Sequence, residues 1–169
     1  MDKAITTALL IVISMVMVLL LFNAAYPAII EGGDAINSMS DRTSNRLRTH
    51  ITVIHISSEQ DPTGNWYDHN ANTTVDVFAW VKNTGTTRIP AMDQLDLFFG
   101  PQTDFQRIPH ESAAGSGPYW SWHLENDTAW NPTATLRITI HHPGTLPAGR
   151  YFLRVVTPDG SISETFLGI

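Results

Sequence analysis

Hydrophobic residues are concentrated at the N-terminal end of the chain. Residues 4–30 contain no charged side chain, and the nearest charges are Asp2, Lys3 and Glu31. About 20 apolar residues suffice to cross a hydrocarbon core of roughly 30 Å, so this run is long enough to span a membrane. Beyond the run, hydrophobic positions recur at helical gaps of three, four and seven residues. We predict a hydrophobic N-terminal helix over residues 1–48.

The predicted helix is longer than a bilayer requires. At 1.5 Å per residue it would measure roughly 70 Å. Pro27 and the Gly32-Gly33 pair are expected to kink or soften it, because proline removes a backbone donor and glycine favours coil. A cleaved secretory signal is not expected, since the apolar run is too long for one and no clean small-x-small site follows it. Two uses of the helix remain: a single-pass membrane anchor, or the core of a filament.

From about Thr49 the hydrophobic pattern changes to a period of two, which is typical of β-strands. The alternation has one slip, at Ile54, and Asn83-Thr84-Gly85 is an expected turn with a glycine available for positive φ. The predicted strands cover residues 50–57, 75–82, 94–99, 119–124, 134–141, 150–157 and 161–167. Short strands separated by Gly and Pro turns indicate an antiparallel, immunoglobulin-like β-sandwich. The predicted class is therefore α+β, with the helix at 1–48 and the sandwich at 49–169.

Two segments resemble a known family. Residues 75–100, with Lys82-Asn83-Thr84-Gly85 between two strands, resemble the strand–Lys-Asn-x-Gly–strand motif of archaellum proteins, both filament subunits and stator proteins. Residues 148–169 resemble the final hairpin of the same group. The resemblance to archaellins and archaeal type IV pilins implies a basic leader removed by a class III signal peptidase. Bacterial type IV pilins have a glutamate at the fifth mature position, whereas this chain has Ile5, which fits the archaellum branch.

The resemblance implies a structural subunit of an extracellular, archaellum-like filament for motility. The subunit would wait in the membrane, meet the assembly machinery and then join a homopolymer. A helix that is apolar on every side needs either lipid or other helices around it. The residues expected to pack in the filament core are Leu9, Leu10, Ile13, Val16, Met17, Leu20 and Leu21. The alternatives are a membrane-anchored stator or accessory protein of the archaellum, an adhesion pilus subunit, and a carbohydrate-binding module on a stalk.

Composition narrows the partners further. The formal net charge of −6 argues against nucleic acid and anionic lipid surfaces as partners. The absence of cysteine excludes disulfides and thiolate chemistry. An extracellular domain of this kind must therefore be stabilised by packing, subunit contacts or bound ions.

Few residues indicate chemistry. The histidine groupings, such as His141-His142, lack the spacing of a zinc site, and no cofactor or enzymatic activity is expected. An incomplete calcium-loop pattern is formed by Asp61, Asn65 and Asp68, which are otherwise read as an ordinary turn. Asn72 and Asn126 begin N-glycosylation sequons. The tryptophans and tyrosines are expected in the sandwich core and in lateral subunit contacts, with a sugar-binding surface as the alternative.

Overall fold

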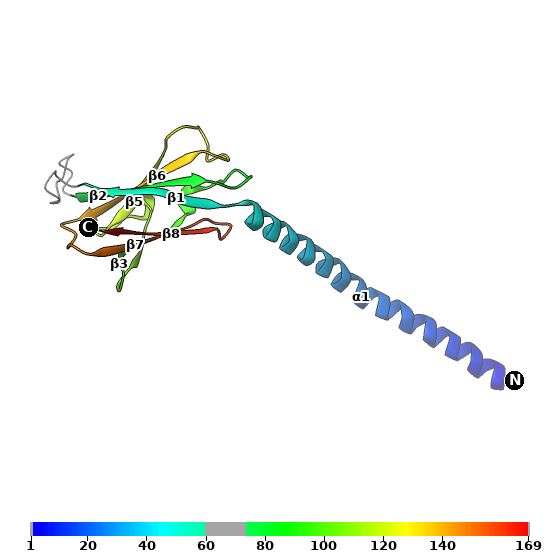
Figure 1. Ribbon diagram of the computed structural model, residues 1–169. Helices are drawn as coiled ribbons and strands as arrows, with labels where there is room; N and C mark the ends of the chain where they lie inside the picture. The colour runs from blue at the N-terminus through cyan, green and yellow to red at the C-terminus, as the bar shows by residue number, and fades with distance from the viewer. Residues whose placement is uncertain (1, 60–73, 169) are drawn as a thin grey trace. The chain divides into compact units, whose positions relative to one another are not determined.

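The computed structural model describes residues 2–59 and 74–168 (Figure 1). One long helix, α1 (Asp2–Arg48), precedes all the strands, and its helical hydrogen bonding continues through Pro27 and the two glycines. Pro27 and the two glycines, which were expected to kink or soften the helix, therefore do not interrupt α1, because proline removes only one backbone donor. The chain forms two compact units, Met1–Thr43 and Ser44–Ile169, so the last residues of α1 belong to the same unit as the strands.

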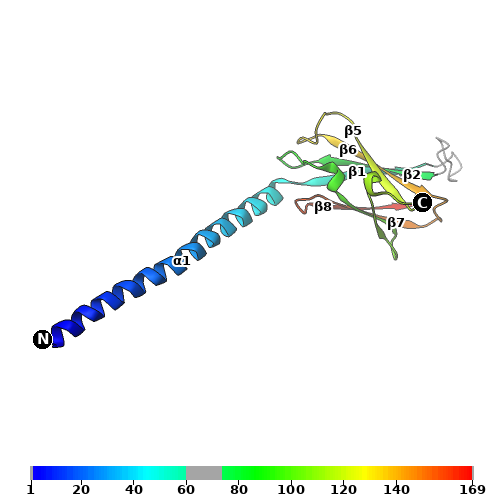
Figure 2. The same cartoon turned by 180° about the vertical axis from the view of Figure 1, so that it is seen from behind.

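Eight antiparallel strands in the described residues form two four-stranded sheets, which face each other as layers in Figures 1 and 2. The first sheet has the order β1-β2-β6-β5 and the second β4-β3-β7-β8. The strands of the first sheet are β1 (Ile51–Ser58), β2 (Thr74–Asn83), β6 (Thr135–Pro143) and β5 (Tyr119–Leu124). Those of the second are β4 (Gln106–Ile108), β3 (Asp96–Pro101), β7 (Arg150–Val156) and β8 (Ile162–Gly168). The predicted helix followed by an antiparallel two-sheet sandwich is confirmed.

The core lies between the two sheets and follows the predicted alternation. In β2 and β6 every second side chain points inward, and Val77, Val81, Leu136, Ile138 and Ile140 are fully buried. Trp120 and Trp130 are also fully buried, so two tryptophans contribute their large side chains to the core. Full burial of a large apolar side chain contributes about 1.5–3 kcal/mol, which accounts for a disulfide-free domain of this size.

The structure adds local details to the predicted strands and changes some of them. The slip at Ile54 is a β-bulge between Val53 and His55, which leaves the Ile54 side chain exposed. β3 begins at Asp96, because a short 3-10 helix, η1 (Met92–Gln94), precedes it, although Leu95 is buried as expected. β4 was missed, since three residues are too few to show a period of two, and so was a second 3-10 helix, η2 (Glu111–Ala113).

Candidate functional site

The apolar run lies within α1, and no residue of α1 is buried. Among the described residues one helix is long and apolar enough to cross a membrane, and it is this one. The seven side chains predicted to pack in a filament core are all exposed in the single chain: Leu9, Leu10, Ile13, Val16, Met17, Leu20 and Leu21. Such a surface must be covered by lipid or by other protein, and the filament role of these residues stays a prediction.

The end of α1 is held by the turn that follows β2. The Thr86 N–H donates to the Arg48 carbonyl, and the Thr84 and Gly85 N–H groups both donate to the His50 carbonyl, each at 2.9 Å. A Cβ on Gly85 would overlap the Arg48 carbonyl oxygen and lie 2.6 Å from the His50 nitrogen. Gly85 is absent from the residues with positive φ, so the expected reason for this glycine was wrong. It is required because two backbone segments meet there.

Asn83 is the second essential residue of the same turn and is fully buried. Its side-chain Nδ2 donates to the carbonyls of Thr87 (2.9 Å) and Trp130 (3.0 Å), and its Oδ1 accepts from the Gly85 N–H (3.0 Å). Every polar atom of this amide therefore has a partner, which a buried amide requires. Asn83 and Gly85 belong to the Lys-Asn-x-Gly motif that carries the resemblance, and the structure gives each of them a physical role.

The second sheet also contacts the end of α1. Thr49 is buried, and its hydroxyl lies 3.2 Å from the Thr87 hydroxyl and 3.3 Å from Oδ2 of Asp159, in the β7–β8 turn. Thr157 and Ser161 close that turn and are buried as well. The Thr157 N–H donates to the Ser161 carbonyl, and the Ser161 N–H donates to the Thr157 hydroxyl oxygen, each at 2.9 Å. We call the cluster of Thr49, Asn83, Gly85, Thr87 and Asp159 the helix clamp. It joins the chain after Arg48 to both sheets.

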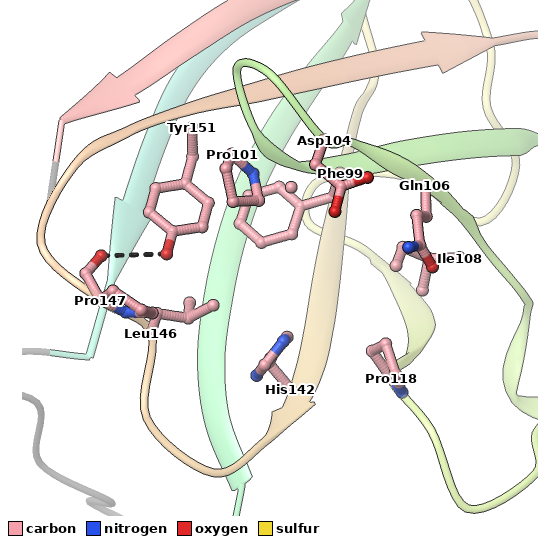
Figure 3. Close-up of a pocket in the computed structure, with 11 residues that line it drawn as sticks. Phe99, Pro101, Asp104, Gln106, Ile108, Pro118, His142, Leu146, Pro147 and Tyr151 are labelled. Atoms are coloured by element: carbon pink, nitrogen blue, oxygen red, sulfur yellow. Dashed lines mark hydrogen bonds between the residues drawn. The ribbon is translucent and has the colours of Figure 1, made fainter.

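A cavity of about 310 Å³ opens at the end of the sandwich where β6 leads into β7 (Figure 3). Phe99 and Tyr151 stack on each other in its wall at 5.5 Å between ring centroids. The Tyr151 hydroxyl donates to the Pro147 carbonyl at 2.9 Å, and burial raises the pKa of Tyr151. The polar side chains Asp104, Gln106 and His142 complete the lining. The cavity could accept one amino-acid side chain or a small molecule.

His142 is a second group of this cavity whose pKa is shifted. Burial lowers the pKa of His142 below its usual value of 6.5, because the charged imidazolium loses hydration. Its Nδ1 is buried without a hydrogen-bond partner among the described residues. The sequence could not reveal this site, since its lining comes from β3, β4, the start of β5 and the β6–β7 turn.

A second cluster, on the outer face of the first sheet, was also missed. Oδ1 of Asp76 lies 2.8 Å from Nδ1 of His141, and Nε2 of His141 lies 3.0 Å from the Ser121 hydroxyl. These atoms have the connectivity of a Ser-His-Asp triad. However, none of the three residues lines the cavity, and the ring of Tyr119 stacks on His141 at 4.7 Å. We interpret the cluster as a set of hydrogen bonds that links β2, β6 and β5. The expectation that the chain has no enzymatic activity stays a prediction.

The structure describes only some of the residues that the sequence suggested for calcium binding and N-glycosylation. Asp61, Asn65, Asp68 and Asn72 lie outside the described residues. Asn126 is exposed, and its Oδ1 accepts from the Thr135 N–H at 2.9 Å, so the sequon lies on the surface. Within residues 2–59 and 74–168, no group of three or more His, Asp or Glu side chains could hold a metal ion.

The alternative of a sugar-binding surface needs exposed aromatic side chains, and a test of it would substitute Trp120 or Trp122. Trp120 is fully buried in the core and cannot stack on a sugar. Trp122 is partly buried and packs against the same core. The expected placement of tryptophans in the core therefore holds for Trp120 and Trp130.

One protein of similar sequence spans almost the whole chain. No family model matches the chain. A protein of Archaeoglobus fulgidus, described only as uncharacterized, is 26% identical over 165 residues, which cover 94% of this chain and 93% of that protein. The sequence similarity therefore extends over both the apolar helix and the sandwich of this chain.

Solved structures with a similar fold are archaellum stator proteins. The archaellum periplasmic stator protein FlaG from Sulfolobus acidocaldarius is 22% identical with a TM-score of 0.54, covering 70% of this chain and 99% of that chain. A chain of the periplasmic stator complex FlaF and FlaG from the same organism is 21% identical with a TM-score of 0.53, covering 70% and 89% respectively. At these identities the likeness establishes a shared fold.

Proposed function

We propose that this chain is a membrane-anchored stator or accessory protein of an archaellum. The observation that carries the proposal is the fold likeness to the FlaG stator protein, joined to the apolar helix that FlaG-like anchoring would need. This corresponds to the stator alternative and replaces the filament subunit as the preferred interpretation. The fold comparisons give the homopolymer and the extracellular filament no support.

In this role residues 4–30 span the cell membrane and the sandwich lies outside it. The uncharged run is long enough for a tilted or slightly oversized span, and Asp2, Lys3 and Glu31 mark its two ends. The polar residues 31–48 would add a spacer of roughly 27 Å at 1.5 Å per helical residue. No catalytic role is assigned to the chain.

The helix clamp suits a protein that bears load between a membrane and an external structure. Force arriving at Arg48 passes into the first sheet through the turn at Gly85 and into the second through Thr49 and Asp159. Hydrogen bonds to both sheets distribute that load over the whole sandwich. A flexible linker after Arg48 would transmit tension only once extended and would resist bending and rotation poorly.

The partner is expected to be another protein of the same machine. The FlaG structure is also known in a complex with FlaF. By analogy, the sandwich of this chain would bind a second protein outside the membrane rather than polymerise through α1.

Affinity purification of the tagged full-length chain from solubilised cell membranes tests the proposal. Archaellum proteins should be enriched over a purification in which an unrelated single-span protein carries the same tag. Enrichment comparable to that control would overturn the proposed function.

A further inference from the structure

Exposed apolar side chains of the sandwich gather on one side of it. In the described residues outside α1, four large apolar side chains are exposed: Ile54 (54%), Phe105 (40%), Ile162 (48%) and Phe166 (43%). Ile162 and Phe166 lie on β8, an edge strand of the second sheet, and Phe105 immediately precedes β4, the other edge strand. Three of these four exposed apolar side chains therefore lie on or next to the edge strands of the second sheet.

The register of β7 and β8 shows that these side chains share the outer face of the second sheet. Leu153 and Val155 of β7 point into the core, so Phe152 and Arg154 point outward. Phe152 pairs with Phe166 across the two strands, and their rings are 5.3 Å apart. Phe152 is nearly buried on this outer face because neighbouring rings cover it.

Gly100 holds the third ring in place. It pairs with Phe152 in the β3–β7 ladder, and a Cβ there would lie 2.7 Å from the Asp104 carbonyl oxygen and 2.8 Å from the Phe105 Cα. The β3–β4 connection can therefore lie against the sheet, which brings the Phe105 ring to 4.8 Å from Phe152. We call Phe105, Phe152, Ile162, Phe166, Arg150 and Arg154 the Phe/Arg face.

Arginines occupy the rest of this face. The Arg154 guanidinium bonds to Glu164 at 2.6 and 2.7 Å and lies 5.4 Å from the centre of the Phe152 ring. Arg107 makes a similar pair with Asp96 at the β3–β4 side. Arg150 lies 4.0 Å above the Phe166 ring and makes no ion pair with any described residue.

The charge of the second sheet is opposite in sign to that of the molecule. Its four strands contain three arginines and two carboxylates, whereas the whole chain has a net charge of −6. Arg150 has no ion-pair partner among the described residues, and it lies beside the most exposed aromatic ring of the face. Aromatic and arginine side chains are the types that dominate the energetic centres of protein interfaces.

We infer that the Phe/Arg face is the docking surface for a different protein whose contact surface combines aliphatic side chains with a carboxylate. Phe105, Ile162 and Phe166 would pack against the aliphatic groups, and the carboxylate would pair with Arg150. A second copy meeting this face two-fold would bring together two surfaces that both carry more arginines than carboxylates, which disfavours a homodimer. The inference deepens the proposed function and rests on it for the expectation that the partner belongs to the archaellum.

Photo-crosslinking in intact host cells tests the inference on the full-length chain. The photoreactive residue p-benzoylphenylalanine replaces Phe166, and mass spectrometry identifies the crosslinked peptides. A matched control carries the same residue in place of Phe78, on the outer face of the first sheet. We expect crosslinks from position 166, and none from position 78, to a peptide of another protein that contains Asp or Glu. Crosslinks to a second copy of the chain, to lipid alone or to nothing would overturn the inference.

Charge reversal then tests the role of Arg150. In the crosslinking chain, Arg150→Glu should lower the yield about tenfold, whereas Arg150→Lys should retain most of it. Arg137→Glu, on the outer face of the first sheet, is the control and should leave the yield unchanged. An unchanged yield in Arg150→Glu would overturn the pairing of Arg150 with a carboxylate of the partner.

The identity of the crosslinked protein separates this inference from the proposed function. An acidic partner from outside the archaellum would support the docking surface and contradict the proposed function. Archaellum proteins that co-purify with the chain but form no crosslinks would support the proposed function and contradict the docking surface.

Discussion

Asn83 and Gly85 act together where α1 ends, one by hydrogen bonding and the other by its lack of a side chain. The Asn83 amide ties its own turn to Trp130, and Gly85 lets that turn approach the backbone of Arg48 and His50. A sequence motif identifies such residues. It cannot say whether a glycine is needed for a positive φ or for the close approach of another backbone segment. The approach of Gly85 to Arg48 arises from segments 37 residues apart, and local turn rules do not include it.

Substitution of Gly85 tests the close approach. Gly85→Ala should destabilise the sandwich by about 2–3 kcal/mol, because the new methyl group overlaps backbone atoms that cannot move independently. Gly117→Ala is the matched control, since a Cβ at Gly117 meets nothing within 4 Å. Urea unfolding in detergent, followed by tryptophan fluorescence, to which the buried Trp120 and Trp130 contribute, measures the stability of both variants. Equal midpoints for the two variants would contradict the clamp.

His142 should make stability depend on pH. Its pKa is lowered in the folded state, so the unfolded chain binds the proton more readily. Above about pH 6.5 the imidazole is neutral in both states, and the pH does not change the free energy of unfolding through His142. As the pH falls from there toward the lower pKa of the folded state, the unfolded chain binds the proton first and the free energy of unfolding decreases. His142→Gln should flatten the decline in unfolding midpoint between about pH 7 and pH 5. Gln106→Ala, which alters the same cavity without a titrating group, should keep the parent slope, and a parent-like slope in His142→Gln would contradict the assignment.

At the scale of elements, the period of the hydrophobic pattern was sufficient for α1 and for the long strands. β2 and β6 alternate over nine or more residues, and both were predicted to within two residues at each end. β4 and the two 3-10 helices were missed because three residues carry no period. The contact of Asp76 with His141 depends on how β2 pairs with β6. It was missed because the two residues lie 65 positions apart in the sequence.

Charges placed inside the apolar part of α1 should prevent membrane integration. A carboxylate at the centre of a span costs about 2.5–3.5 kcal/mol, so Ile13→Asp combined with Leu20→Asp should cost about 5–7 kcal/mol. Ile36→Asp combined with Met39→Asp, beyond Glu31 in the polar part of the same helix, is the control. Alkaline carbonate extraction of cell membranes measures the integrated fraction. Full retention of the Ile13/Leu20 variant would contradict a membrane span.

At the scale of the whole molecule, the apolar helix is compatible with two environments. Lipid and a bundle of identical helices both cover Leu9, Ile13 and Leu20 equally well, so hydrophobicity alone cannot distinguish an anchor from a filament core. Our proposal of an anchor is based on the sandwich, whose fold is similar to that of stator proteins and whose Phe/Arg face has the composition of a protein interface.

The location of the chain in cells tests the central claim most directly. Surface filaments are sheared from cells, and the chain is quantified by mass spectrometry in the filaments and in the membranes. We predict that nearly all of it remains with the membranes and that another protein forms the filaments. Recovery of this chain as the main protein of the sheared filaments would contradict the account.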